Sequence, residues 1–405
     1  LHFQRVADGV PTASIVGSTE RLPLEAAAFV NAIAARYLDF NDIYLSKEAV
    51  HPSDNIAVGL ALAQGLERNG RELLAAVLKG YEVHCRLADT VSTRKGGWDN
   101  VILGAIASSV MAGSLLRLSI PQQAQAIAIA ATGNVALMET RAGTLSMWKA
   151  AAAPYAARAG VFAAMHASYG MTAPTGALDG KFGLFAQVTG QSDISAFNCD
   201  NGPWRSLNVH LKAFPAQYFT QTAIEAALSL REWIGDASIE KVRVGTFEFG
   251  RVAAADSPEK WCPRTRETAD HSMPYCVAVA LLDGQVGEAQ FEAARITASD
   301  VQTLLQKIEV AEDESLNPLY PEKVPSRITV DLSDGRSLAE AVDYPLGHSR
   351  NPMSREQVSD KFDGLARNPS QPGGLLEALM GVDHLNEKEL GVALAKLAQF
   401  DGDAI

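Results

Sequence analysis

Apolar residues recur with the helical period through most of the first 170 residues. Segment 24–38 follows Pro23 and spaces Phe29, Ile33 and Leu38 close to that period, which predicts a helix. These stretches are rich in Ala, Gly and Ser, and small residues let helix axes approach closely. The inner ones are apolar on most faces, which predicts a compact bundle with buried helices. Five further helices are predicted, at 56–66, 71–88, 101–118, 121–131 and 150–169.

A different pattern follows a connection at about 179–204, which is rich in Gly, Asn, Ser and Pro and therefore marks a domain boundary. Residues 241–249 alternate like a half-buried strand. Residues 327–332, a Ser-Asp-Gly turn at 333–335 and the residues that follow predict a β-hairpin. Predicted helices at 220–233 and 298–306 and a strand-like apolar run at 276–282 complete this α+β unit.

Helical patterns return near the end of the chain, at 356–366, 374–380 and 386–400. We expect these helices to pack back on the first ones, which would make the α+β unit an insertion. The predicted fold is mostly α with an α+β second domain: a large all-helical domain formed by both chain ends, and a smaller inserted α+β lid. The predicted boundaries are 1–190 for the first helical part, 191–345 for the lid and 346–405 for the returning helices.

Composition narrows the classes of function. The chain has 405 residues, 20% of them charged and 47% hydrophobic, which excludes a mainly disordered or fibrous protein. Its net charge is −12, without the basic stripe that nucleic acid or an anionic membrane requires, so neither partner is expected. A small acid remains possible as a ligand, because a pocket needs only a few local cations. The longest uncharged apolar run, 101–116, falls short of the roughly 20 residues of a membrane span.

Several kinds of site have no support in the sequence. The four cysteines form no CxxC pair, so neither a disulfide framework nor a zinc or iron–sulfur site is expected, and a reducing compartment is favoured. We expect a cytoplasmic location, or a mitochondrial one in a eukaryote. The chain does not begin with Met, and we expect its natural start to lie upstream. Nucleotide-binding, zinc-protease and serine-hydrolase motifs are missing, so acid–base chemistry without a metal or cofactor is predicted.

Four polar clusters interrupt the helical pattern. The first, at 39–42 and 51–55, brings two carboxylates and His51 together, and capping or turn formation is the alternative reading. The second, at 141–149, ends in Lys149 before an almost uncharged helix. Because an unpaired buried ammonium is costly, Lys149 must reach solvent or meet an anion, either a substrate carboxylate or an internal Asp or Glu.

The third cluster places Lys212 among apolar residues near the predicted boundary, where clefts tend to form, although a surface lysine is the alternative. The fourth, at 264–275, contains two Arg, Glu267, Asp270 and His271. A solvated loop with internal ion pairs is one interpretation. An imidazole beside Asp270 is also suited to act as an oriented general acid or base.

Five segments carry a resemblance to a known family. They are YLDFND at 37–42, HPSDN at 51–55, TRAGTLSMWK at 140–149, KWCPRTRETADHSMPY at 260–275 and GHSRNPM at 347–353. In this order they resemble the MmgE/PrpD family, which includes 2-methylcitrate dehydratases, cis-aconitate decarboxylases and iminodisuccinate epimerases. The resemblance implies a helical domain, an α+β lid and a homodimer with active sites in the interdomain clefts. It also implies that Asp42, His51, Lys149 and Lys212 are active-site residues.

Two departures from the family pattern concern proton transfer. Asn100 stands where dehydratase-like members commonly have a His, and a second expected His is replaced by Gln217 or Phe219. An amide holds a carboxylate by hydrogen bonds but does not exchange a proton near neutral pH. The departures therefore favour a reaction that needs fewer proton-donating side chains.

The mechanism that follows is proton or carboxylate removal α to a carboxylate. Lys149 and Lys212, with Arg141, are expected to hold the substrate carboxylates and stabilise the developing enolate-like charge. His51, oriented by Asp42, is expected to transfer the proton, and His271 is a second acid–base candidate. Asn100, Ser146, Gln217 and Tyr218 are the further expected substrate-binding residues.

We therefore predict a cofactor-independent dehydratase of a citrate-like hydroxy polycarboxylate, with a small di- or tricarboxylate as its ligand. Two alternatives remain open. One is a decarboxylase or an epimerase or isomerase of a related polycarboxylate, because such enzymes need fewer leaving-group acids. The other is a catalytically silent homologue that binds a polycarboxylate.

Overall fold

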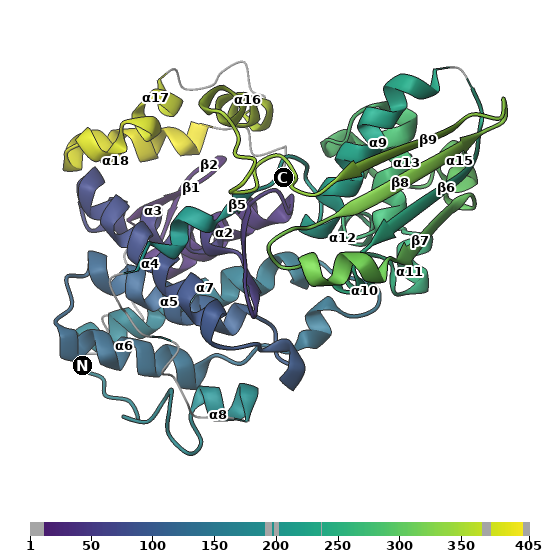
Figure 1. The fold of residues 1–405 in the computed structure, drawn as a ribbon. Coiled ribbons are helices and arrows are strands. Elements are labelled where there is room, and N and C mark those ends of the chain that lie inside the picture. Colours follow the sequence, from purple (N-terminus) through teal and green to yellow (C-terminus); the bar gives the residue numbers. More distant parts are fainter. Residues whose placement is uncertain (1–11, 191–196, 198–201, 236, 367–373, 400–405) are drawn as a thin grey trace.

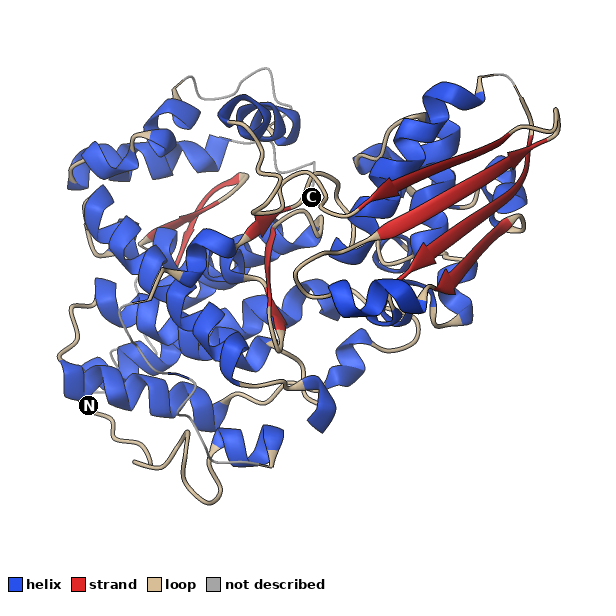
Figure 2. Cartoon of the chain, in the orientation of Figure 1, coloured by secondary structure: helices blue, strands red, loops and turns tan. Residues whose placement is uncertain are grey.

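The computed structural model describes residues 12–190, 197, 202–235, 237–366 and 374–399. A helix-rich part lies beside a part built around a four-stranded sheet (Figures 1 and 2). Most of the predicted helices are confirmed within a few residues of their expected ends. The first part contains α2 (Leu24–Tyr37), α3 (Ile56–Gly65), α4 (Gly70–Thr90), α5 (Val101–Leu115), α6 (Ile120–Gly133), α7 (Trp148–Ser168) and α8 (Leu184–Thr189).

Helix α5 is the centre of this part and packs against α4, α6 and α7. Nearly all of its residues are buried, as the uniformly apolar sequence predicts. Close packing with α7 depends on Gly160, where an added Cβ would lie 2.4 Å from the Ser108 Cβ and 2.6 Å from the Ala105 carbonyl oxygen. The small residues noted in the sequence thus allow α5 and α7 to pack closely where they cross.

Short strands connect distant segments of the chain. Strands β1 (Ala13–Ile15) and β2 (Ser18–Leu22) form a hairpin, and β3 (Asp42–Leu45) lies between β4 (Ala49–Val50) and β5 (His210–Leu211). The sequence pattern predicted no strand between the helices at 24–38 and 56–66, where β3 and β4 lie. These strands of two to four residues are too short to show a period. Pairing of β3 with β5 brings the segment that contains Asp42 next to the segment that precedes Lys212.

The second part is a sheet of order β7-β6-β8-β9, in which β6 is parallel to β7 and the other pairs are antiparallel. The predicted hairpin is confirmed, and the strand predicted at 241–249 ends at residue 246. The strand predicted at 276–282 is wrong, because this run lies in helix α13 and is buried on every side. A short apolar run has no period that separates such a helix from a strand. The strands are β6 (Ile239–Thr246), β7 (Ile308–Glu312), β8 (Ser326–Leu332) and β9 (Ser337–Val342).

Helices cover one face of this sheet (Figure 2). Helix α9 contacts β8 and β9, and α13 contacts α9, α15 and β7. Their apolar side chains form one core with the inner face of the sheet. The helices of this part are α9 (Gln221–Ile234), α10 (Glu248–Ala255), α11 (Pro258–Trp261), α12 (Arg266–Ala269), α13 (Met273–Asp283), α14 (Ala293–Ile296) and α15 (Ser299–Leu305).

The last helices return to the first part (Figure 1). They are α16 (Arg355–Leu365), α17 (Leu375–Met380) and α18 (Glu387–Ala395), and α18 packs against α3. Leu390 and Leu394 share a core with Val58 and Leu62. The fold is mostly α with small sheets, as predicted, while the domain boundaries at 190 and 345 stay a prediction. Within the described ranges, no helix has the length and apolar character needed to cross a membrane.

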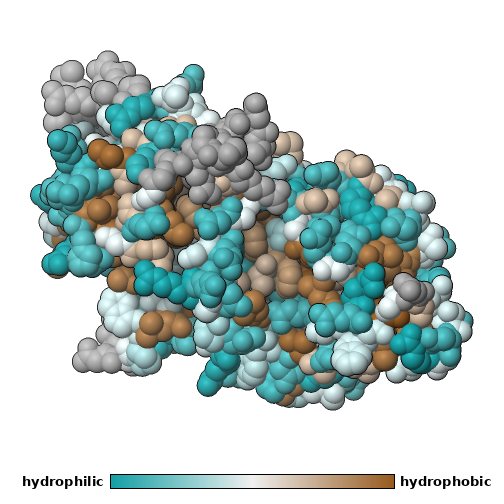
Figure 3. Space-filling view, turned by 90° about the horizontal axis from the view of Figure 1, so that it is seen from above, coloured by the Kyte–Doolittle hydropathy of each residue, from teal (hydrophilic) through white to brown (hydrophobic). Residues whose placement is uncertain are grey.

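The surface seen from above is mostly hydrophilic, with apolar side chains gathered near the junction of the two parts (Figure 3). Polar side chains where the two parts meet are shielded from water, since Asp39, Lys149 and Lys212 are no more than 2% exposed.

Candidate active site

A cavity of about 180 Å³ is lined by side chains from the helical part and from the α+β part. It is smaller than the roughly 300–1,000 Å³ typical of sites for drug-sized ligands, and suits a small ligand. Its wall combines cations with imidazoles: Arg36, Arg94, Arg141, Lys212, Lys260, His51 and His271.

The end of α2 begins the site. Asp39 follows this helix with a φ of 49°, a left-handed conformation that turns the chain toward β3. Antiparallel pairing then sets Asp42 opposite Leu211, so that Lys212 comes next to the turn at Asp39. Two segments that lie 173 positions apart in the sequence meet here through backbone hydrogen bonds and side chains.

The buried Asp39 carboxylate contacts three cations. Arg36 Nη1 donates to Oδ1 at 2.6 Å, and Lys212 Nζ donates to Oδ2 at 2.8 Å and to the Asp39 carbonyl oxygen at 2.7 Å. Lys149 Nζ lies 3.6 Å from Oδ1. Burial acts to raise the pKa of Asp39, but Lys149, Lys212 and Arg36 outweigh it and hold the pKa well below its ordinary value. Asp39 is therefore ionised and fixes the three cations.

The two lysines predicted to act on substrate converge on this carboxylate. Lys149, in the first turn of α7, also lies 3.5 Å from Asp270 Oδ1, so it meets internal acids, as the sequence left open. It contacts the site through Asp39 and Asp270 and is not part of the cavity wall. Lys212 is part of the wall, and burial lowers its pKa to about 8 despite the attraction of Asp39.

His51 enters the cavity from the connection after β4. Its Nδ1 lies 2.6 Å from the carbonyl oxygen of Asp42. Because a carbonyl oxygen only accepts, Nδ1 carries the proton and Nε2 keeps its lone pair. Burial, followed by Arg36 and Lys212, holds the pKa of His51 well below its ordinary value. The imidazole is therefore neutral at neutral pH.

Asp42 contacts His51 through its backbone carbonyl oxygen and not through its carboxylate. The Asp42 carboxylate instead accepts hydrogen bonds from the Ser53 backbone nitrogen at 3.0 Å and Ser53 Oγ at 2.5 Å. Burial raises the pKa of Asp42, and the bonds from Ser53 oppose this rise. Asp42 is not part of the cavity wall, so its direct role is to shape the turn that positions His51.

His271 enters from the connection after α12, in the α+β part. Its Nδ1 forms a hydrogen bond with Asp270 Oδ1. Burial, then Lys149, lowers the pKa of His271 to about 4, although Asp270 acts in the opposite direction. Two neutral imidazoles thus line one cavity, each contributed by a different part of the molecule.

The predicted substrate-binding residues divide into two groups. Arg141, Asn100, Gln217 and Tyr218 line the cavity. Ser146 is exposed and lies outside the wall, where its carbonyl oxygen accepts a hydrogen bond from the Lys149 backbone nitrogen at 3.0 Å. Ser146 therefore takes part in the first turn at the start of α7.

Three of the lining residues already have protein partners. Arg141 donates from Nε to Asp99 Oδ2 at 3.0 Å, and Asn100 Nδ2 donates to the Ala49 carbonyl oxygen at 2.6 Å. Gln217 Oε1 accepts from the Phe219 backbone nitrogen at 2.7 Å. The hydroxyl of the buried Tyr218 has no hydrogen-bond partner in the described part of the chain.

Sequence reasoning missed two arginines of the wall. Arg36 pairs with Asp39 at the end of α2 and donates to Asn41 Oδ1 at 2.8 Å. Its spacing of three residues from Asp39 is a signal that pointed to this pair. Arg94 belongs to a short 3-10 turn, Arg94–Gly96, whose sequence shows no motif.

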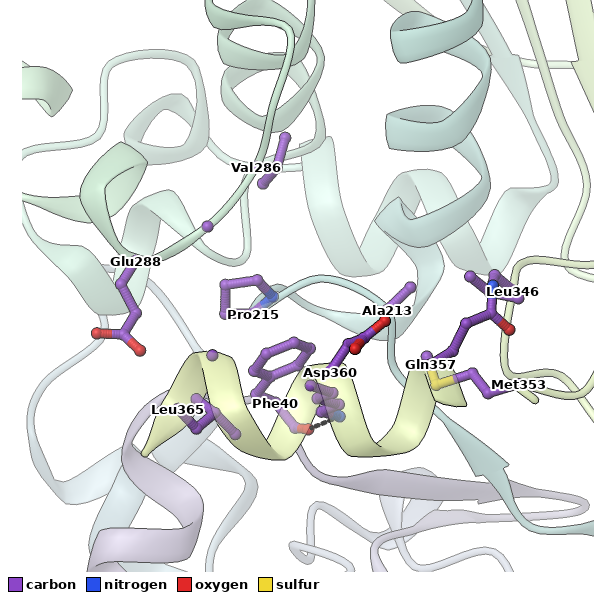
Figure 4. A pocket seen from close by; sticks show the side chains of 13 residues that line it. Phe40, Ala213, Pro215, Val286, Glu288, Leu346, Met353, Gln357, Asp360 and Leu365 are labelled. Carbon is purple, nitrogen blue, oxygen red and sulfur yellow. Dashed lines mark hydrogen bonds between the residues drawn. The ribbon is translucent and has the colours of Figure 1, made fainter. Parts of the chain in front are cut away.

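A larger cavity, of about 370 Å³, lies between α16 and the chain around Pro215 (Figure 4). Figure 4 shows Phe40 against α16, where Lys361 Nζ donates to the Phe40 carbonyl oxygen at 2.7 Å and to the Lys212 carbonyl oxygen at 2.9 Å. Its wall contains Glu288 and Asp360 and no imidazole, so the smaller cavity is the better candidate for the chemistry. Helix α16 thus braces the backbone beside Asp39 and at Lys212.

No group of His, Cys, Asp and Glu side chains suited to a metal ion was found in the described residues. Comparison with protein-family models matched residues 3–196 to the MmgE/PrpD N-terminal domain and residues 214–371 to the MmgE/PrpD C-terminal domain.

Among curated relatives, a 2-methylcitrate dehydratase of Salmonella typhi is 32% identical over 364 residues, which cover 84% of this chain and 74% of the relative. A cis-aconitate decarboxylase of Homo sapiens is 30% identical over 361 residues, covering 84% and 72%. An alkylcitrate dehydratase of a fungal species is 27% identical over 396 residues, covering 91% and 78%.

Proposed function

The chain belongs to the MmgE/PrpD family, and from this premise we propose that it is a cofactor-independent lyase that dehydrates a citrate-like hydroxy polycarboxylate. Membership makes the chain an enzyme of the lyase type, with the subclass left open. The names of its relatives support a dehydratase or decarboxylase of a citrate-like acid.

The charge of the cavity wall carries the proposal. The whole chain is acidic, with a net charge of −12, yet the wall contains five basic side chains and two acidic ones. The wall therefore attracts a polycarboxylate even though the chain as a whole is acidic. The five basic residues are Arg36, Arg94, Arg141, Lys212 and Lys260, and the two acids are Asp39 and Asp256.

The proposed reaction begins with removal of a proton from the carbon next to a substrate carboxylate. His51 Nε2 has the free lone pair needed to accept this proton, because Nδ1 is bound to a carbonyl oxygen. Breaking the C–H bond places negative charge on the carboxylate. Lys212 and Arg36, held in place by Asp39, stabilise that charge without having to reorganise.

The second half of the reaction is the departure of the hydroxyl group. The C–O bond breaks as the double bond forms, and a donated proton turns the leaving group into water. Lys212, with a pKa of about 8, remains mostly protonated at neutral pH and is suited to give this proton. His271, with a pKa of about 4, is neutral and is suited to a hydrogen-bonding role.

The test is turnover of 2-methylcitrate and citrate, followed by absorbance of the unsaturated product. We expect Lys212→Met to lower kcat by at least about 100-fold, the effect of removing one preorganised donor. His51→Asn keeps a hydrogen-bonding amide but has no base, and should lose activity to a similar extent. The matched control Lys241→Met removes a partly exposed lysine that pairs with Glu309 on the sheet, and should leave kcat unchanged. Full activity of Lys212→Met would remove the basis of the mechanism.

A decarboxylase is the second candidate, and one observation favours it. The two positions where a His was expected are amides or apolar groups, and both Asn100 and Gln217 are already engaged by backbone groups. Decarboxylation needs no acid for a departing hydroxyl. NMR of the reaction in deuterated water separates the cases, because it distinguishes loss of water, loss of carbon dioxide and simple exchange. Binding without any turnover would instead support a silent polycarboxylate-binding homologue. The homodimer and the cytoplasmic or mitochondrial location remain predictions.

A further inference from the structure

Arg94 is the cation of the cavity wall whose side chain is least occupied by the protein. It lies in the turn between α4 and α5, is partly buried, and lines the cavity. Other arginines of the wall are engaged through their terminal nitrogens: Arg36 Nη1 with Asp39 and Arg141 Nη2 with Asp99. In the part of the chain that the structure describes, neither Nη1 nor Nη2 of Arg94 has a hydrogen-bond acceptor.

A buried carboxylate holds the base of this side chain. Glu48 Oε1 accepts from Arg94 Nε at 3.0 Å, and Oε2 accepts from the backbone nitrogens of Thr93 at 2.8 Å and Arg94 at 3.3 Å. Thr93 Oγ1 adds a fourth bond at 3.0 Å. With its side chain only 1% exposed, Glu48 orients both the turn and the guanidinium.

The α+β part holds the guanidinium from the other side. Arg94 Cζ lies 4.8 Å from the centre of the Phe249 ring, in α10. The ring face attracts the cation, and together with Glu48 it limits the side chain to one orientation. Both contacts leave the edge formed by Nη1 and Nη2 free. A planar fork with two free donors matches the two oxygens of a carboxylate.

We propose that Arg94 binds a substrate carboxylate remote from the Asp39–Lys212 pair, and so selects acids with an additional carboxylate. This inference rests on the proposed function, because it takes the small cavity to be the substrate site. It narrows the ligand class to tricarboxylates, in which two carboxylates meet other cations of the wall, such as Arg36 and Lys212, and the third reaches the turn at Arg94.

The experiment measures binding, so that it does not depend on turnover. Tricarballylate has three carboxylates and no hydroxyl group to lose, and glutarate has two carboxylates on the same length of chain. Isothermal titration of both acids compares the wild type with Arg94→Met, Arg94→Lys and Lys95→Met. Lys95 is exposed, belongs to the same turn and does not line the cavity. Lys95→Met therefore changes the net charge as Arg94→Met does, but outside the cavity.

We expect Arg94→Met to weaken tricarballylate binding by about 10- to 100-fold, as for loss of a charge-assisted hydrogen-bonded pair. Glutarate binding should weaken less, so the preference for the tricarboxylate should fall. Arg94→Lys keeps the charge and the pairing with Glu48, and should recover part of the affinity. Lys95→Met should leave both affinities within about twofold, because an exposed charge is screened.

A purely structural Arg94 would weaken both acids by the same factor, and that result would overturn the inference. Unchanged tricarballylate binding in Arg94→Met, or no binding to the wild type, would overturn it too. If the wild type turns over citrate but Arg94→Met binds tricarballylate as tightly as the wild type does, this inference alone is refuted. If Arg94→Met weakens tricarballylate binding as expected but the wild type turns over none of the tested acids, the proposed reaction alone is refuted.

Discussion

Asp39→Asn removes the charge on which Arg36, Lys149 and Lys212 converge. The substituted amide has nearly the same shape, so the change tests electrostatics more than packing. Each of the three cations has a side chain no more than 2% exposed, so bulk water compensates little for the lost carboxylate. Removing one partner of a buried ion pair costs about 3–5 kcal/mol, and the remaining acids, Asp54 and Asp270, recover part of this. We therefore expect unfolding free energy to fall by about 3 kcal/mol or more.

The pH dependence of stability gives the sign of the effect. The folded pKa of Asp39 is well below its ordinary value, so its contribution is present above the unfolded pKa of about 4 and is lost as pH falls toward the folded pKa. Urea unfolding of the wild type should lose this contribution in acid. Asp39→Asn lacks it at every pH, so the difference between the two proteins should be largest near neutral pH and shrink below pH 4.

Asp331→Asn is the matched control. Asp331 pairs with Arg243 on the exposed face of the sheet, where its side chain is 31% exposed, and a pair of this kind contributes little. Equal urea midpoints for Asp39→Asn and Asp331→Asn would refute the view that Asp39 holds the three cations. A loss in Asp39→Asn that does not change between pH 7 and pH 3 would refute the electrostatic explanation.

Further outcomes follow from the same contacts. The pKa of His51 is well below its ordinary value, so kcat/KM should stay constant as pH falls through 6.5. Activity should decline near pH 8, where Lys212 loses its proton. A pH–rate profile measures both effects. Because Ser146 is exposed and outside the wall, Ser146→Ala should change kcat and KM by less than about twofold; a loss of activity comparable to Lys212→Met would place it in the site after all. Gly160→Val should lower the thermal midpoint, because the first added carbon already meets Ser108 at 2.4 Å and overpacking costs about 1–3 kcal/mol; an unchanged midpoint would contradict the close crossing.

Long helices were predictable from sequence: α4 has an apolar pattern that repeats over several turns, and the apolar run of α5 is too long for a strand. Short elements were not. Strands β3 and β5 contain only a few residues each, and their pairing depends on chain segments far apart in sequence. The run at 276–282 illustrates the opposite failure, since uniform burial removes the alternation that distinguishes a strand from a helix.

The sequence predicted which residues belong to the site, but it predicted only part of the contacts between them. The family resemblance pointed to Lys149, Lys212 and His51, and the structure brings all three near Asp39 or the cavity it lines. It left open whether Lys149 meets an internal acid, because the partners come from the end of α2 and from Asp270, more than 100 residues away on either side. Arg94 has no motif, and only Glu48 and Phe249 around it reveal its orientation.

The pairing of Asp39 with Lys212 also has a consequence for synthesis on the ribosome. A nascent chain that contains Asp39 must grow by another 173 residues before Lys212 exists, and further still before His271 follows. Until then the chain contains Arg36, three residues away, and later Lys149 as cations that pair with Asp39. The growing polypeptide thus acquires its charge-balanced centre late, when distant contacts finally form, and the cavity wall is incomplete until Lys212 and His271 have been added.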